Sequence, residues 1–250
     1  SFDFPEYFFF SRSLAGLYYN QNRKSLIVTF TCPEIWYYKK RSNFQMHGIY
    51  NIKEKQWERT FGSLPEPYST DGVAYPFIVS NPYCLTVGDT SYVTFSMNPN
   101  IFVYNNLTGK MIRVVCGNSE LLQLTEPYSY SQIENRELEL SFVKTKGWYG
   151  TLQYHSDLRL FSRTLTLNAY NSASDDIKKE TAVIFFDENL VRIGSHLFDK
   201  NGTYAGVGGD GFSVGFATPD GFIGSFKKEH YISDDQFRYA VKFKIVINTE

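Results

Sequence analysis

Six acidic residues lie in turn-like segments, where two carboxyl groups could come together as the catalytic pair of a glycoside hydrolase. That chemistry needs two carboxyl groups roughly 5–10 Å apart. Asp in a turn also commonly accepts hydrogen bonds from its own backbone, and this local role is the favoured interpretation. We therefore treat a hydrolase that uses two turn carboxylates as an alternative hypothesis for the function, and not as the leading one. The six residues are Asp71, Asp157, Asp187, Glu188, Asp210 and Asp220.

No other catalytic signature is supported by its context in the chain. The histidines lie far apart without metal-ligand spacing. The run 211–215 matches Gly-x-Ser-x-Gly, but it falls in a strand-like segment and not at a strand-to-helix turn, so we assign it no nucleophile. The glycine-rich run 206–211 precedes a strand-like segment, whereas a phosphate loop needs a helix there, so we interpret it as a tight connection. We predict no catalytic residue, no metal and no cofactor. The histidines are His47, His155, His196 and His230.

Three cysteines, Cys32, Cys84 and Cys116, form no Cys-x-x-Cys pair, and their odd number makes a poor disulfide framework. Two segments match the glycosylation sequon, at Asn106 and at Asn201. Both segments also contain residues typical of turns, and a role in a turn is the simpler interpretation of each.

Aromatic and arginine side chains are the favoured binding candidates. Trp and Arg are enriched at recognition surfaces because they combine a large contact area with directional polar contacts. Aromatic side chains in strands also pack across neighbouring strands, so core packing is the competing interpretation. The predicted ligand-binding residues are Trp36, Trp57, Trp148, Tyr149, Tyr154 and Arg163.

The composition is that of a near-neutral, aromatic-rich chain. Its 250 residues carry a formal net charge of -1, and 18% of them are aromatic. A nucleic-acid-binding protein normally carries a basic stripe, so this balance argues against nucleic acid as a partner. No run of about 18 apolar residues exists, so we expect no membrane-spanning segment. The chain begins at Ser1 without an initiator Met, and we expect any export signal to have been removed or to lie outside these residues.

The stretch 148–194 predicts one four-stranded antiparallel sheet. It contains four short strand-like runs separated by turn residues, and none of them has a helical period. Similar hairpins are predicted on both sides of it, at 17–30, 49–61, 84–95, 101–115 and 212–226, with a last strand at 237–247. We also expect an edge strand within 7–10, a proline-rich connection at 63–81 and one irregular strand around 138–143.

These units recur along the chain. An apolar strand after a turn begins at Ser25, Ser91, Leu158 and Gly221, at intervals of 66, 67 and 63 residues. Propeller blades repeat at about 40–50 residues, and inserted loops lengthen that interval. The sequence therefore predicts an all-β fold, a β-propeller or partial propeller of repeated four-stranded antiparallel sheets, as a single domain over 1–250. A β-sandwich is the runner-up because it too contains many short strands.

One segment resembles a known family. The run Tyr149-x4-Tyr154-x4-Arg159-x-Phe161-x-Arg163, followed by 186–190, resembles a blade of the Bacteroides-type propeller lipoproteins of the uncharacterised DUF4221 family. That family is similar to the six-bladed propellers. The resemblance covers roughly residues 148–247, and His155 departs from it by standing where the family pattern usually has Asp.

The resemblance implies an exported protein, periplasmic or at the outer-membrane surface, with a lipid anchor outside these residues. Members of the family are longer than this chain, which is then either a fragment or a smaller member. Because no activity is established for the group, the resemblance implies fold and location without chemistry. The leading hypothesis is a non-enzymatic binding module for a glycan or a protein partner. The alternatives are the glycoside hydrolase and a purely structural scaffold.

Overall fold

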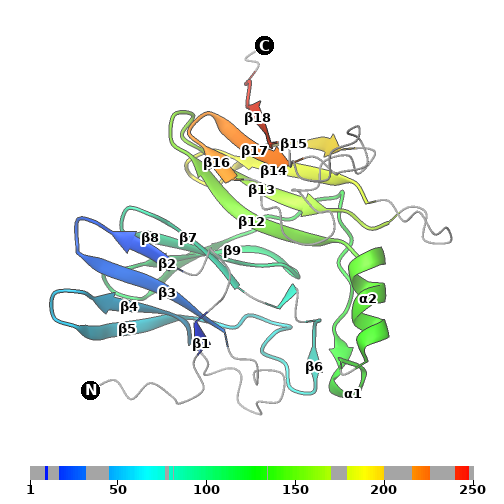
Figure 1. Ribbon diagram of the computed structural model, residues 1–250, viewed down its shortest axis with the longest axis horizontal. Coiled ribbons are helices and arrows are strands. Elements are labelled where there is room, and N and C mark those ends of the chain that lie inside the picture. Colours follow the sequence, from blue (N-terminus) through cyan, green and yellow to red (C-terminus); the bar gives the residue numbers. More distant parts are fainter. Residues whose placement is uncertain are drawn as a thin grey trace. The chain divides into compact units, whose positions relative to one another are not determined.

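The computed structural model describes residues 9–10, 17–31, 45–76, 79–80, 82–133, 135–169, 179–199, 216–225 and 240–247. Within these ranges the fold is all-β and propeller-like, because antiparallel sheets, several of them four-stranded, follow one another along the chain (Figure 1). The chain divides into two compact units. The N-terminal unit comprises residues 1–118 and 126–140, and the C-terminal unit comprises 119–125 and 141–250.

The N-terminal unit contains the first two sheets. The first sheet is formed by β2 (Leu17–Asn20), β3 (Ser25–Thr31), β4 (Gln45–Asn51) and β5 (Gln56–Ser63). The short strand β1 (Phe9–Phe10) pairs with the end of β3, beyond the residues that pair with β2, which confirms the expected edge strand.

The second sheet has the order β10-β9-β8-β7. Its strands are β7 (Pro82–Val87), β8 (Thr90–Phe95), β9 (Asn98–Asn105) and β10 (Met111–Val115). The connection at 63–81 contains only the two-residue strand β6 (Val73–Ala74) among its described residues. This strand pairs with β11 (Tyr128–Ser129), which leads into the short helix α1 (Tyr130–Ile133).

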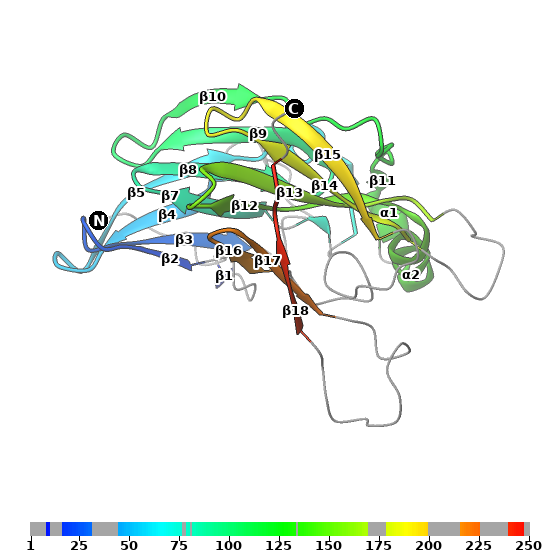
Figure 2. The same ribbon diagram turned by 90° about the horizontal axis from the view of Figure 1, so that it is seen from above.

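The C-terminal unit contains the third and fourth sheets. The third sheet consists of β12 (Trp148–His155), β13 (Leu160–Thr166), β14 (Thr181–Phe186) and β15 (Arg192–Asp199), with β15 as an outer strand (Figure 2). This order confirms the sheet predicted over 148–194. The fourth sheet consists of β16 (Phe216–Thr218), β17 (Gly221–Ser225) and β18 (Ala240–Lys244). The glycine-rich run 206–211 lies outside the described residues.

Two backbone features repeat from sheet to sheet. Each hairpin turn after the first and third strands of the first three sheets contains a residue with positive φ; these are Lys24, Lys55, Gly88, Gly109, Arg159 and Leu190. In the first three sheets, the strands β5, β10 and β15 each carry an extra residue near their start, which is Glu58, Ile112 and Ile193 respectively. Such bulges twist an outer strand and hinder pairing with another chain. The recurrence confirms the repeat read from the sequence.

The strand predicted around 138–143 is wrong, because this segment is the helix α2 (Arg136–Thr145). Leu138, Leu140 and Phe142 alternate as in a strand, but Leu138 and Phe142 are also four residues apart, on one helix face. Only Phe142 of the helix is buried. Asn135 caps the helix by accepting hydrogen bonds from the amides of Glu137 and Leu138. Capping and charges at the helix ends therefore outweighed the alternating pattern.

The core of the third sheet lies along its two central strands. β13 and β14 are buried on both faces, and their apolar side chains are almost inaccessible to solvent. Each fully buried side chain of this size contributes about 1.5–3 kcal/mol to folding. This core fixes the positions of β12 and β15 at the two sides of the sheet. Its members are Leu160, Phe161, Leu165, Ala182, Val183, Ile184 and Phe186.

Candidate binding surface on the third sheet

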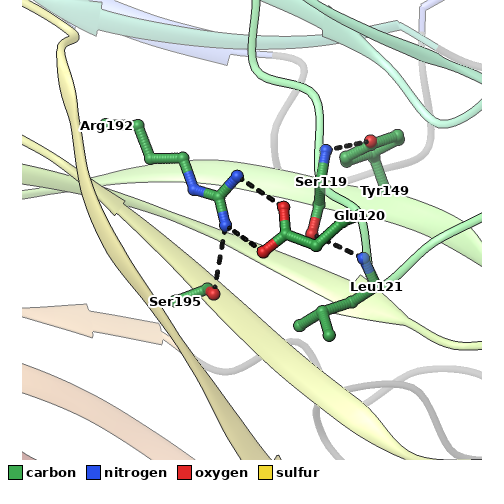
Figure 3. Close-up of polar contacts among 6 residues, drawn as sticks. All are labelled: Ser119, Glu120, Leu121, Tyr149, Arg192 and Ser195. Atoms are coloured by element: carbon green, nitrogen blue, oxygen red, sulfur yellow. Dashed lines mark hydrogen bonds and ion pairs between the residues drawn. The ribbon is translucent and has the colours of Figure 1, made fainter.

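The outer strand β15 carries a well-defined polar cluster in the C-terminal unit. The Arg192 guanidinium donates two parallel hydrogen bonds to the Glu120 carboxylate, at 2.8 and 2.9 Å, and a third to Ser195 Oγ at 3.2 Å (Figure 3). This two-pronged geometry is the strongest form of an arginine–carboxylate contact. Arg192 and Glu120 therefore hold each other in one orientation.

The turn between β14 and β15 determines the position of Arg192, the first residue of β15. Asp187 Oδ1 accepts hydrogen bonds from the amides of Asn189 and Val191, and Leu190 adopts φ 63° with its side chain buried. This local bonding is the usual turn role of Asp. Arg192 then pairs with Phe186 on β14. The bonded turn thus positions Arg192 at the start of the strand.

Glu120 is held by its neighbours in the chain. The Ser119 amide donates to Tyr149 Oη at 3.2 Å, and the Leu121 amide donates to Ser119 Oγ at 3.3 Å (Figure 3). Tyr149 belongs to β12 and is completely buried. The buried tyrosine therefore ties the segment that carries Glu120 to the third sheet.

The electrostatics keep this pair charged. The hydrogen bond from Arg192 is the main reason that the pKa of Glu120 is lowered to about 2, and the same contact raises the pKa of Arg192. The Glu120 side chain is 69% exposed, so water screens the pair and its contribution to stability is small. A carboxyl group with so low a pKa is a poor general acid at neutral pH.

The residues next to Glu120 and Arg192 in the sequence are exposed and apolar. Leu121 is 40% exposed, Val191 60% and Ile193 53%. Arginine beside apolar side chains is a composition enriched at the centres of protein interfaces. The Arg192 surface is defined as the following residues: Glu120, Leu121, Val191, Arg192, Ile193 and Ser195. It has the chemistry of a binding surface.

Two of the predicted ligand-binding residues lie together inside the third sheet. The Arg163 guanidinium carbon is 4.4 Å from the centroid of the Tyr149 ring, and Arg163 Nε donates to the Gly150 carbonyl at 3.3 Å. Neither side chain is accessible to solvent. Their contacts are those of core residues, and their role in ligand binding stays a prediction.

Three further predicted aromatic residues, Trp57, Trp148 and Tyr154, are partly exposed. Trp148 lies under the Lys179 ammonium, which is 4.1 Å from the ring centroid and also donates to carbonyls at the end of α2. Tyr154 packs on Phe161, with 4.8 Å between ring centroids. Trp57 belongs to the N-terminal unit, where it packs between Phe30 and Tyr50. Trp36 lies outside the described residues.

Most of the described turn carboxylates have local partners. Glu188 pairs with Arg159, and Asp220 lies 2.9 Å from the Lys242 ammonium. The hydrogen bond from Lys242 lowers the pKa of Asp220. Asp187 bonds its own turn, as described above. Only the Asp187 contacts match the favoured interpretation, in which a turn Asp bonds its own backbone, because Glu188 and Asp220 form ion pairs with other segments. Asp71 and Asp157 are exposed, and Asp210 lies outside the described ranges.

The remaining candidates are dispersed. Among the described residues no group of three or more His, Cys, Asp or Glu side chains could hold a metal ion. His47 and His155 are buried in different sheets, His196 is exposed and His230 lies outside the described residues. Burial raises the pKa of Cys84 to about 11, so this thiol is unreactive at neutral pH, whereas Cys116 is an exposed free thiol.

One sequon can be assessed. Asn106 is only 2% exposed, so a glycan could not be attached to its side chain in the folded protein. Asn201 lies outside the described residues.

Sequence reasoning missed the Arg192 surface. Glu120 and Arg192 are 72 residues apart and share no motif. Val191 and Ile193 alternate around Arg192 in what we interpreted only as strand pattern. The one usable signal was the bonded turn at Asp187, since it predicts where β15 begins. It does not predict which carboxylate meets the arginine.

Comparison with known proteins shows similarity of fold. A DUF4221 family member from Bacteroides vulgatus matches with a TM-score of 0.60 and 12% identity, over 93% of this chain and 63% of that one. This chain therefore spans less than two thirds of that protein. Hydrazine synthase from Kuenenia stuttgartiensis matches with a TM-score of 0.41 and 12% identity, over 90% of this chain and 48% of that one. No family model and no curated protein matches the sequence.

At 12% identity, this structural similarity shows a shared fold and nothing about function. In the described part of the chain, neither helix has the length and apolar character needed to cross a membrane.

Proposed function

We propose that this chain is part of a β-propeller domain of the DUF4221 type that acts, after export, as a non-enzymatic binding module for a protein partner. The single observation that carries the proposal is the Arg192 surface, in which a bidentate arginine–glutamate pair has exposed apolar residues as its neighbours along the chain. Arginine anchors with apolar neighbours are typical of the residues that contribute most to protein recognition. The fold likeness supports the propeller assignment, and the family resemblance supports export to the periplasm or the outer-membrane surface.

The lowered pKa values of Glu120 and Asp220 favour binding over hydrolysis. A glycosidase needs one carboxyl group whose pKa is raised, so that it can protonate the leaving group. Within the described ranges, Glu120 and Asp220 are the carboxyl groups with a clear pKa shift, and both pKa values are lowered. A hydrolysis assay on a panel of oligosaccharides tests this reading directly. Turnover that is abolished by Asp157→Ala would replace the binding module with the hydrolase.

The binding test uses the purified chain as bait in an envelope extract of the source organism, followed by identification and purified reconstitution of any captured protein. Arg192→Glu and Ile193→Asp should each weaken the reconstituted complex at least tenfold, because they place charge in a desolvated contact. Arg159→Glu is the matched control, since Arg159 also forms an exposed ion pair, with Glu188 on a different turn. Equal losses in all three variants would contradict a specific role for the Arg192 surface.

Glycan recognition is the second candidate, favoured by the partly exposed aromatic rings of Trp148 and Tyr154 on β12. Aromatic faces pack well against sugar rings because they are apolar and flat. A glycan array probed with wild type, Trp148→Ala and Arg192→Glu separates the two candidates. Binding that depends on Trp148 and not on Arg192 would favour a glycan, whereas no glycan signal leaves the protein partner as the proposal.

A further inference from the structure

The turn between β9 and β10 buries an amide side chain without a protein partner. The backbone amide of Asn106 donates to the Asp89 carbonyl at 2.9 Å, which fixes the turn against the preceding one. The Asn106 side chain is 2% exposed, and neither its Nδ2 nor its Oδ1 contacts a hydrogen-bonding group of the described residues. Buried amide groups almost always have such a partner. This side chain therefore indicates a bound ligand.

A second orphaned group lies over the same turn. Arg59, from β5 of the first sheet, donates from Nη1 to the carbonyl of Leu107, the residue after Asn106. Its Nε is buried and likewise without a partner among the described residues. Arg59 Cδ lies 3.2 Å from the point that a Cβ of Gly109 would occupy, and Gly109 has φ +67°. A side chain at position 109 would crowd Arg59 by a few tenths of an ångström, and the positive φ itself favours glycine there.

The hydrogen-bonding character of these groups defines the ligand. Asn106 Nδ2 and Arg59 Nε are donors, whereas Asn106 Oδ1 is an acceptor. A bare anion would leave Oδ1 unsatisfied, and a metal cation would face the N–H donors. A neutral hydroxyl group can accept from the donors and donate to Oδ1. Water is the hydroxyl ligand that an interior site of this kind ordinarily holds.

We propose that Asn106 binds an internal water molecule in the N-terminal unit, with Arg59 Nε as its second donor. The water joins the turn of the second sheet to β5 of the first sheet. In this proposal, the role of the buried Asn106 in the sequon is to bind this internal water.

The test is detection of a long-lived bound water by water–protein nuclear Overhauser spectroscopy on the folded chain. Wild type should show cross-peaks from the bound water to the Asn106 side-chain amide protons and to other protons of this turn. The cross-peaks to the other protons of the turn should be lost in Asn106→Leu. Asn98→Leu is the matched control. Asn98 is also buried, but its Nδ2 donates to the Glu66 carbonyl and its Oδ1 accepts from the Asn100 amide. This variant should lose stability and keep the Asn106 water signal.

The wild-type spectrum alone decides the matter if Asn106→Leu fails to fold. A folded wild-type protein without a water cross-peak at Asn106 overturns the proposal. A rise in Tm on Asn106→Leu overturns it as well, because removing a truly unsatisfied amide stabilises a protein, whereas removing a hydrated one does not.

Discussion

The first and third sheets each bury a histidine, and the two rings are bonded very differently. His155 Nδ1 lies 2.9 Å from the Thr218 carbonyl, and its Nε2 lies 2.7 Å from Ser162 Oγ. A carbonyl only accepts, so Nδ1 carries the proton and Nε2 accepts from the Ser162 hydroxyl. In the first sheet, His47 Nδ1 contacts Thr29 Oγ1 at 3.0 Å, but its Nε2 has no partner among the described residues.

The difference shows that burial of the same residue type serves two purposes. His155 joins β12 to the start of the fourth sheet through a specific tautomer, and both ring nitrogens are used. His47 mainly fills space, with its ring 5.2 Å from Phe61 and its edge against Gly62. A Cβ at Gly62 would lie 2.6 Å from His47 Cδ2, and Gly62 has φ +82°. Position 62 therefore has to be glycine for this histidine to fit.

The polar bond between sheets also has a weaker counterpart in the N-terminal unit. Asn20, like His155, is the last residue of the first strand of its sheet, and it reaches the first turn of the next sheet. Its Nδ2 lies 3.4 Å from both the Gly88 carbonyl and Asp89 Oδ1. These long contacts are worth less than the short bonds of His155. Equivalent positions thus use different chemistry and differ in strength.

The largest expected effect is the pH dependence that His47 imposes. Burial lowers the pKa of His47 from 6.5 to about 3. The unfolded chain takes up a proton on this residue below about pH 6.5, whereas the folded chain does so only near pH 3. The free energy of unfolding should therefore fall as the pH drops through this window, by on the order of 4 kcal/mol. Urea unfolding at several pH values measures it.

The matched variant for the pH series is Thr29→Val combined with His47→Phe, which removes the titrating ring and its hydroxyl partner. The difference between the wild-type and variant curves of unfolding free energy against pH should give the contribution of His47. Parallel curves between pH 6.5 and pH 3 would show that the histidine is not buried in solution.

His155→Ala should be the most damaging of the single substitutions. It leaves the Thr218 carbonyl and the Ser162 hydroxyl without their partner and opens a cavity, with a cost of about 2–4 kcal/mol. Chemical denaturation at pH 7.5 measures this loss. A cost below that of Asn20→Ala would contradict the stronger bonding that we assign to His155.

Asn20→Ala should cost about 1 kcal/mol. It removes the two long contacts to the second sheet and the acceptor for the Arg23 amide at 3.2 Å. The effect should be confined to the N-terminal unit, which amide hydrogen exchange of the β7–β8 turn can monitor. Faster exchange in the third sheet would show that the contact acts beyond its own unit.

The smallest expected effect is that of Thr29→Val with His47→Phe at pH 7.5, which should lie within about 1 kcal/mol of wild type. Both partners of a buried hydrogen bond are replaced by apolar groups of similar shape, and the orphaned Nε2 disappears. Thermal unfolding measures the change. A loss as large as that of His155→Ala would mean that His47 Nε2 has a strong partner after all.

The repeat was legible in the sequence because turns and alternating strands are local. The intervals between Ser25, Ser91 and Leu158 correspond to real sheets, and the turn residues stand where the strands end. The helix α2 was missed because the alternation of Leu138, Leu140 and Phe142 fits both a strand and one helix face. The cap at Asn135 was the local signal that decided between them.

The candidate site was harder to predict from the sequence than the fold. Tyr149 and Arg163 were predicted to bind a ligand, but the sequence could not tell an exposed pair of side chains from the buried pair that the structure contains. Glu120 and Arg192 attracted no attention because a contact between residues 72 apart leaves no trace in spacing. Partners of this kind are set by which strand lies at the side of a sheet.

The amino-acid sequence by itself determined the all-β class, the hairpins and the order of the sheets, since these follow from short-range alternation and turn chemistry. Only the tertiary structure decided which polar groups found partners. The hydrogen bond from His155 to Thr218, and the unpartnered polar groups of Asn106 and His47, depend on the distances between segments far apart in the chain. A change of a fraction of an ångström to one ångström in these distances decides whether a hydrogen bond forms. Local patterns contain no record of those distances.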